Sequence, residues 1–337
     1  MAMSSFSSSF GLKSIQSLPT VIIPGDPIPS LSVTSITPPS GYTGCECFNI
    51  SSDGTSIIFI NGNQNVWLSF DCGVTWNEKM RLWAGGKKAC ISNSGKDSII
   101  LLTNLTIAIS NDWGQNYNHV NVATGAAGAT NWYDISMSDD GKYICLAGYN
   151  QKIYLHNNYG IGNYATWRKV TQLTTTNFYV CSMSKNGKYI SASVSSAWNS
   201  ECWYSSDYGV LGSFKKITTT IYGGFYTPSE FTILLTASGV SISKTIENTI
   251  AGLFTLQNTT LINSTNSNNI VTNLSGSTIY FIGLNNKDIY ISTDYLKTAT
   301  IFTTMTTLTL GIKYSENTQF MLVWDGTLKV LKTTYVL

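Results

Sequence analysis

The stretch SFDCGVTW at residues 69–76 has the pattern of a strand, a tight turn and a second strand. Asp71 can accept hydrogen bonds from backbone N–H groups of its own turn, and Gly73 can adopt the positive φ angle that such a turn requires. The large ring of Trp76 can then cover the turn. The pattern S-x-D-x-G-x-T-W therefore predicts a β-hairpin.

Weaker copies of this pattern follow along the chain. The third copy contains an insertion before its aromatic residue, Trp167. The residues that correspond to Asp71 are Asp112, Asn158, Asp207 and Asp294, with steps of 41, 46, 49 and 87 residues. The last step spans two periods with one degenerate copy between them, so the hairpins indicate a repeat.

A second kind of turn repeats with the same period. It is a small polar turn, such as SSDG at residues 51–54, and it ends an apolar strand. The marker residues of these turns are Gly54, Gly95, Gly141, Gly187, Glu230, Gly276 and Asn317. Their steps of 41, 46, 46, 43, 46 and 41 residues define seven units. A period of roughly 40 to 45 residues with about four short strands is typical of a β-propeller blade.

Short runs rich in β-forming residues lie between the two kinds of turn, for example at 56–60 and 98–102. No segment shows a sustained apolar period of 3.6 residues, so helices should be few. We therefore predict an all-β fold, with a seven-bladed β-propeller of four-stranded blades at residues 42–337.

Residues 1–41 contain six of the seven prolines and few charges, which predicts an extended N-terminal arm. A flexible tail is one interpretation. The many apolar residues favour an ordered arm that lies on a surface of this chain or of a neighbour. We also expect the last strand, at 327–336, to close the ring by pairing with strand residues just after the arm.

The composition limits the possible partners and compartments. Charged residues make up only 11% of the chain and the net charge is +2, so nucleic acid is not an expected partner. No apolar stretch approaches the length of a membrane span, and the first residues do not resemble a secretory signal. The seven cysteines lack the paired spacing of a zinc site, so we expect reduced thiols, no metal and a cytosolic origin.

The repeated hairpin resembles the Asp-box, or BNR repeat, of sialidases and other propellers. The match is complete at Ser69, Asp71, Gly73, Thr75 and Trp76, and partial at Ser110, Asp112 and Gly114 and at Ser205, Asp207 and Gly209; Asp294 belongs to a poorer copy. The resemblance implies a sialidase-like fold in which each box is a structural turn at the edge of a blade, away from an active site.

Sialidase chemistry is not expected, because sialidase-like enzymes bind the substrate carboxylate with three arginines. This chain has only Arg81 and Arg168, for which we expect ordinary surface roles. Its two histidines lie outside any nucleophile motif, and no phosphate-binding or dinucleotide motif is present, so no catalytic residue and no cofactor is predicted. Glycoside hydrolysis remains open through the loop carboxylates Asp134, Asp139, Asp140, Glu201 and Glu230.

Aromatic residues lie just before the first strand of several units, with Trp83 in a comparable loop. They are Trp83, Trp132, Tyr133, Phe178, Tyr179, Phe225 and Tyr226. At one rim of a propeller they would form an apolar or sugar-stacking platform, whereas the alternative is packing between blades.

These features favour a non-enzymatic interaction protein. Low charge, reduced cysteines and an apolar arm suggest a component of a large assembly, such as a minor capsid, tail or attachment protein of a virion assembled in the host cytoplasm. Residues 1–41 would bind other proteins of that assembly. The alternatives are a lectin-like propeller that binds cell-surface glycan and a glycoside hydrolase. Membrane insertion is not expected.

Overall fold

The computed structural model describes the chain in nineteen segments. They are residues 30–35, 44–103, 106–122, 132–148, 152–161, 166–173, 177–194, 200–221, 225–226, 232–236, 239–243, 255–257, 270–272, 278–282, 287–293, 299–305, 311–315, 320–324 and 328–334. These segments contain 28 β-strands and no α-helix.

The strands of the first four blades follow the chain in order. Blade 1 contains β2 (Cys45–Ile50), β3 (Ile57–Asn61), β4 (Asn65–Ser69) and β5 (Asn77–Arg81). Blade 2 contains β6 (Gly86–Ile91), β7 (Ser98–Leu102), β8 (Thr106–Ser110) and β9 (Asn118–Asn121). Blade 3 contains β10 (Trp132–Met137), β11 (Ile144–Gly148), β12 (Tyr154–His156) and β13 (Arg168–Lys169). Blade 4 contains β14 (Val180–Met183), β15 (Ile190–Ser193), β16 (Ser200–Ser205) and β17 (Lys215–Ile221).

The last three blades complete the chain. Blade 5 contains β18 (Phe225–Tyr226), β19 (Thr232–Thr236), β20 (Gly239–Ser243) and β21 (Thr255–Gln257). Blade 6 contains β22 (Ile270–Thr272), β23 (Ile279–Ile282), β24 (Asp288–Ser292) and β25 (Thr300–Thr304). Blade 7 contains β26 (Gly311–Ser315), β27 (Phe320–Trp324), β28 (Leu328–Thr334) and β1 (Ser30–Ser35).

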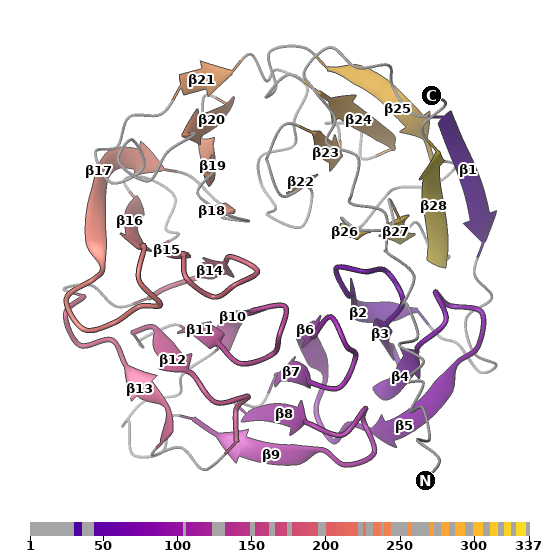
Figure 1. Cartoon of the computed structure of the whole chain (residues 1–337), viewed down its shortest axis with the longest axis horizontal. Helices are drawn as coiled ribbons and strands as arrows, with labels where there is room; N and C mark the ends of the chain where they lie inside the picture. The colour runs from indigo at the N-terminus through magenta and orange to yellow at the C-terminus, as the bar shows by residue number, and fades with distance from the viewer. Residues whose placement is uncertain are drawn as a thin grey trace, which may run out of the picture.

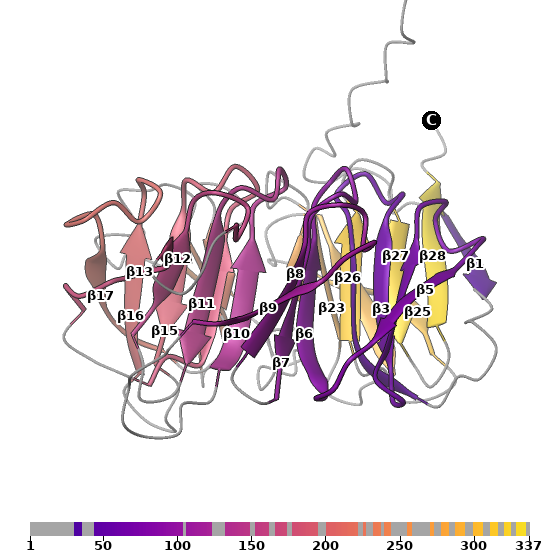
Figure 2. The same cartoon turned by 90° about the horizontal axis from the view of Figure 1, so that it is seen from below.

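The seven sheets stand in a ring around a central axis (Figure 1). In blades 1 to 6 the first strand lies nearest the axis and the fourth forms the outer rim. Neighbouring strands of each sheet are antiparallel, and Figure 2 shows them running from one face of the ring to the other. The prediction of an all-β, seven-bladed propeller with four-stranded blades is confirmed.

The ring closes between the first and last strands of the chain. β1 is the outermost strand of blade 7 and pairs antiparallel with β28, with a register from Ser30 opposite Thr334 to Ser35 opposite Lys329. The last strand thus closes the ring as predicted, but the predicted position of its partner strand was wrong. The partner β1 lies within residues 1–41 rather than after them, so the segment predicted to be an arm supplies an edge strand of the propeller.

The apolar core lies between neighbouring blades. One cluster joins blades 1 and 2 through residues such as Leu68 and Ile100, and another joins blades 2 and 3 through Ile109 and Trp132. The second strands β3, β7 and β11 are buried at every position. Continuous burial on both faces explains why these strands read as uninterrupted apolar runs in the sequence.

We expect deletion of residues 1–35 to destabilise the ring, because the deletion removes β1 and leaves β28 as an open edge. Loss of several ladder hydrogen bonds, each contributing about 1 kcal/mol, should lower the unfolding temperature by roughly 5 °C or more. Thermal unfolding with light scattering measures both the loss and any self-association. Deletion of residues 1–29 retains β1 and is the matched control, and equal unfolding temperatures for the two truncations would contradict the role of β1.

Candidate functional site

The hairpin at residues 69–76 joins β4 to β5 and is held by its own side chains. Ser69 Oγ donates to Asp71 Oδ1 at 2.8 Å and accepts the Gly73 N–H at 2.8 Å. Asp71 accepts the Thr75 N–H at 2.8 Å and the Thr75 hydroxyl at 2.6 Å. Slight burial opposes the charged carboxylate, but these hydrogen bonds outweigh it and lower the pKa of Asp71. Gly73 has the predicted positive φ, 86°.

Within the described segments, four hairpins between third and fourth strands share this arrangement, and we call them the outer turns. They begin at Ser69, Ser110, His156 and Ser205. In each of them the first side chain accepts the N–H of the glycine four residues later, at 2.8 to 3.1 Å. Asp112 repeats the role of Asp71 by accepting two hydrogen bonds from Asn116. Asp294, from the predicted further copy, lies outside the described residues.

His156 replaces the serine in the third outer turn. Its Nδ1 accepts the N–H groups of Asn158 at 3.0 Å and Gly160 at 3.1 Å, so this nitrogen carries no proton. Nε2 therefore carries the ring proton and donates it to Thr166 Oγ1 at 3.0 Å. Burial lowers the pKa of His156, which favours the neutral ring that this turn requires.

The hairpins between first and second strands, which we call the inner turns, lie on the same face of the ring. Strand direction alternates within each sheet, so the first and third connections of a blade share a face. In blade 1 the Cys72 N–H donates to the Thr55 carbonyl at 3.0 Å, and blades 2 to 4 contain the equivalent bond at 2.8 to 3.0 Å. We call this side of the ring the turn face; it is the upper edge in Figure 2.

The inner turns of the first four blades meet near the axis. The Asn93 N–H donates to the Asp139 carbonyl, and the Asp139 N–H donates to the Lys185 carbonyl, both at 2.7 Å. Lys185 Nζ also donates to Ser52 Oγ at 2.7 Å and lies 3.7 Å from Asp139 Oδ2. Because Ser52 belongs to blade 1 and Lys185 to blade 4, this polar contact spans the axis and fixes four blades relative to one another.

An ion pair between a half-buried lysine and a buried aspartate links the inner strands. Lys88 in β6 pairs with Asp134 in β10, whose second oxygen accepts the Cys181 N–H from blade 4 at 3.0 Å. Burial opposes the charge on Lys88, but the carboxylate outweighs it and raises the pKa of Lys88. Asp134 therefore has a structural role, because its two oxygens join blades 2, 3 and 4. Nearby, burial and the like charge of Lys88 lower the pKa of Lys313 in β26 to about 8.

The other loop carboxylates considered for hydrolysis also have structural partners. Asp139 and Asp140 belong to an inner turn, where Asp140 accepts the Ser138 hydroxyl at 2.6 Å. Glu201 pairs with Lys216 across β16 and β17. Glu230 lies outside the described residues.

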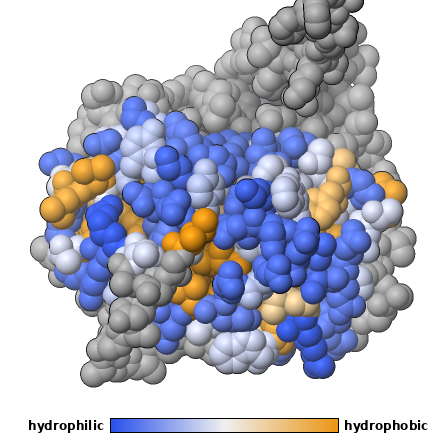
Figure 3. All heavy atoms as spheres, turned by 60° about the horizontal axis from the view of Figure 1, so that its bottom comes forward, coloured by the Kyte–Doolittle hydropathy of each residue, from blue (hydrophilic) through white to orange (hydrophobic). Residues whose placement is uncertain are grey.

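Large apolar side chains gather on the turn face. Of the ten large hydrophobic side chains that are exposed among the described residues, seven belong to the outer turns: Phe70, Val74, Trp113, Ile161, Tyr208, Val210 and Leu211. Val74 is 79% exposed and Leu211 is 72% exposed. Figure 3 shows apolar residues as separate patches on an otherwise hydrophilic surface. The outer turns thus place exposed apolar side chains at several positions around the turn face.

The predicted aromatic rim divides into buried and exposed rings. Trp132 and Phe178 are 0% exposed and belong to the cores between blades 2 and 3 and between blades 3 and 4. The binding role predicted for these two rings is wrong, because their faces are covered by neighbouring blades. Both rings instead pack between blades, which was the alternative prediction from the sequence.

The other rings near the starts of the inner strands lie opposite the turn face. Tyr133 stacks on Tyr179 with 4.5 Å between ring centroids, and Lys87 Nζ lies 5.6 Å from the Tyr133 centroid. Trp83 is 62% exposed and its indole N–H donates to His119 Nδ1 at 2.9 Å. Phe225 and Tyr226 form β18, but their side chains lie outside the described part of the structure.

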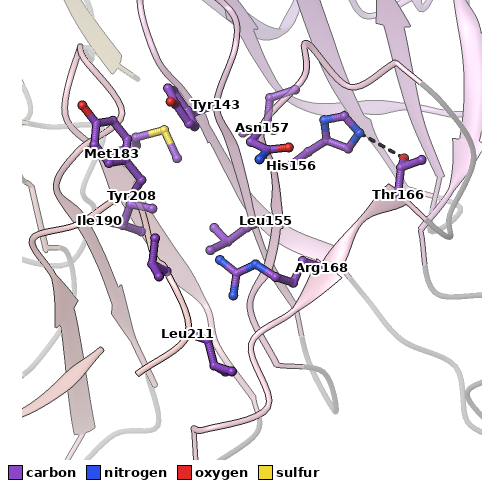
Figure 4. A pocket seen from close by; sticks show the side chains of 12 residues that line it. Tyr143, Leu155, His156, Asn157, Thr166, Arg168, Met183, Ile190, Tyr208 and Leu211 are labelled. Carbon is purple, nitrogen blue, oxygen red and sulfur yellow. Dashed lines mark hydrogen bonds between the residues drawn. The ribbon is translucent and has the colours of Figure 1, made fainter. Parts of the chain in front are cut away.

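A groove with a volume of about 530 Å³ opens between blades 3 and 4 (Figure 4). Leu155, His156 and Arg168 line it from blade 3, and Met183, Ile190 and Leu211 line it from blade 4. Arg168 carries the only fixed charge among the described residues that line the groove. Its Nη2 donates to the Gly209 carbonyl across the seam between the blades. Partial burial lowers the pKa of this guanidinium group.

The lengths of two outer turns explain where the groove lies. In the first outer turn the aromatic residue follows the initial serine by 7 positions, whereas the spacing is 11 in the third turn and 9 in the fourth. The extra residues of the fourth turn include Gly212, which has a φ of 87°, beside the exposed Leu211. Sequence reasoning identified the insertion before Trp167 but assigned Arg168 to an ordinary surface role, so it missed the groove.

The described residues contain neither a metal-binding cluster nor a membrane-spanning helix. In these segments no three His, Cys, Asp or Glu side chains lie close enough to hold a metal ion. The same segments contain no helix long and apolar enough to cross a membrane. None of the seven cysteines forms a disulfide within the chain, and four of them are buried.

Comparison with known proteins shows the fold alone. No family model matches the chain, and no curated protein matches it. Among solved structures, YCF48 bound to D1 peptide has 12% identity and a TM-score of 0.64, over 94% of this chain and 100% of that chain. YCF48 from Cyanidioschyzon merolae has 14% identity and a TM-score of 0.64, over 89% and 98%. Kuenenia stuttgartiensis hydrazine synthase has 12% identity and a TM-score of 0.65, over 88% and 97%.

We expect His156 to make the fold sensitive to mild acid. Its pKa is lowered from an ordinary value near 6.5 in the folded chain, so the unfolded chain binds the proton more readily. Stability should therefore fall as the pH drops below about 6.5. In the His156→Ser variant, which restores the serine of the other outer turns, this contribution should be absent. Urea unfolding of both proteins at pH 7 and pH 5 measures it, and equal losses would contradict the assignment.

Proposed function

We propose that this chain is a non-enzymatic β-propeller that binds other proteins of a large assembly through its turn face and through residues 1–41. The observation that carries the proposal is the concentration of exposed apolar side chains on the outer turns. Peptide binding by another propeller supports it, because YCF48 is described as bound to D1 peptide. Hydrogen bonds within each outer turn keep the backbone fixed, so exposed side chains there are presented without a large ordering cost.

The finer assignment rests on the sequence. The outer turns match the Asp-box pattern, so the proposal includes an Asp-box propeller of the sialidase type without the arginine triad. The proposed assembly is a virus particle, in which the chain is a minor capsid, tail or attachment protein assembled in the host cytoplasm. Residues 1–41 would then have two roles, because β1 closes the ring and the residues before it would anchor the propeller.

We expect the double substitution Val74→Asp and Trp113→Asn to reduce binding to the assembly without unfolding the ring. Both side chains are exposed, and Trp113 has a φ of 58°, which asparagine tolerates. Loss of an apolar anchor of about 2 kcal/mol corresponds to more than tenfold weaker binding. The measurement is the amount of assembly that co-purifies with the tagged chain.

Ile301→Asp is the matched control, because Ile301 is also exposed but lies on the outer strand β25. Deletion of residues 1–29 tests the anchor separately, since it leaves β1 in place. Wild-type levels of the assembly with both the double variant and the truncation would overturn the proposal.

Glycan binding is the second candidate, favoured by the stacked pair Tyr133 and Tyr179 on the opposite face. We expect any signal on a glycan array to be lost in Tyr133→Ala, because the substitution removes an exposed stacking ring. The signal should be retained in Trp113→Ala, whose ring lies on the turn face. An array that shows no signal with the wild-type protein would eliminate this candidate.

A further inference from the structure

We propose that the groove between blades 3 and 4 binds a peptide segment of a partner protein in which an Asp or Glu side chain is flanked by aliphatic residues. This inference rests on the proposed function and names the chemistry that one part of the turn face recognises. Both the apolar walls and the single cation of the groove contribute to the argument.

The walls of the groove come from two blades and are mainly apolar, with His156, Asn157, Thr166 and Arg168 as their polar members. Leu155 in β12 faces Ile190 in β15, and the exposed Leu211 forms the lip at the fourth outer turn. A volume of about 530 Å³ falls within the range of clefts that bury a ligand of several side chains. Leu155 and Ile190 are themselves buried and form the floor of the groove, so the apolar surface that a bound segment would remove from water belongs mainly to Val210 and Leu211 at the lip.

Arg168 supplies the charge that selects the ligand. Figure 4 shows its guanidinium group directed into the groove, between Leu155 and Leu211. The hydrogen bond to the Gly209 carbonyl fixes the orientation of the group and uses one of its five N–H donors. A carboxylate can accept two parallel hydrogen bonds from such a fork, and it offsets the cost of burying the cation.

The position of Arg168 determines where the carboxylate lies in the ligand. Apolar side chains lie on both sides of the guanidinium group, so a bound segment must continue past its acidic residue in both directions. An internal Asp or Glu meets this requirement, whereas a terminal carboxylate would leave one side uncovered. His156 adds no competing charge, because its neutral ring is occupied by the turn and by Thr166.

The test is selection of random twelve-residue peptides displayed on phage. The peptides are fused through their C termini, so none presents a free terminal carboxylate. The immobilised full chain is the target, and the Arg168→Gln variant is used for counter-selection. We expect the selected peptides to contain Asp or Glu beside Leu, Ile, Val or Met. As synthetic C-amidated peptides they should bind Arg168→Gln at least about tenfold more weakly than wild type.

The second arginine of the chain provides a matched control. Arg81 lies in β5 of blade 1, away from the groove, so Arg81→Gln should bind the peptides with wild-type affinity. Arg168→Lys keeps the charge but loses the planar fork, so its affinity should lie between those of wild type and Arg168→Gln. Thermal unfolding of each variant shows whether the ring is intact.

Leu211→Ser provides a second test if Arg168→Gln does not fold, because a side chain that is 72% exposed contributes little to stability. The Leu211→Ser variant should also bind the selected peptides more weakly than wild type. The proposal is overturned if no peptide is selected, if the selected peptides lack acidic residues, or if folded Arg168→Gln or Leu211→Ser binds them as tightly as wild type. Val74 and Trp113 lie on blades 1 and 2, away from the groove. If the Val74→Asp, Trp113→Asn variant loses the assembly while the peptide test fails, the proposed function is retained and only the groove assignment is overturned.

Discussion

In the first four blades, side chains of one innermost strand satisfy backbone groups of the next innermost strand near the axis, and these hydrogen bonds hold the blades together. Asn49 Nδ2 in blade 1 donates to the Ala89 carbonyl of blade 2 at 2.9 Å. Ser136 Oγ in blade 3 accepts the Met183 N–H of blade 4 at 3.0 Å, and Asp134 accepts a further N–H of the same strand. A buried backbone group without a partner costs about 1–3 kcal/mol, so blades 2 and 4 depend on the preceding blade for part of their stability. The outer turns are therefore held at fixed positions around the rim.

Local chemistry explains why the fold could be predicted from the sequence and why the site could be predicted only in part. A turn such as 69–76 is specified by neighbouring residues whose side chains bond to their own backbone, so its pattern survives in the sequence. The pairing of β1 joins residues about 300 positions apart and leaves no local pattern. The burial of Trp132 and Phe178 also depends on the neighbouring blade, which the spacing of aromatic residues does not reveal.

Outer turns that follow the repeat and outer turns that are lengthened have different roles in this molecule. At the seams, the glycine of one outer turn lies against an aliphatic side chain of the preceding blade; Gly209 approaches Leu155 so closely that a Cβ atom there would clash. The repeated turns thus build the scaffold, with His156 able to replace serine because its Nδ1 accepts the same N–H bonds. The lengthened third and fourth turns meet at one seam, and there the scaffold gains a groove with an arginine. Variable loops on a rigid frame are where binding sites usually lie.

The pairing of β1 with β28 also determines the order of events during synthesis. β1 leaves the ribosome first, but its partner is made last, so closure is the contact of highest sequence separation in the ring. Until β28 appears, the nascent chain holds an unpaired strand and an arc of blades. A strand supplied by a second nascent chain could satisfy the same edge, which would give two rings joined by exchanged first strands.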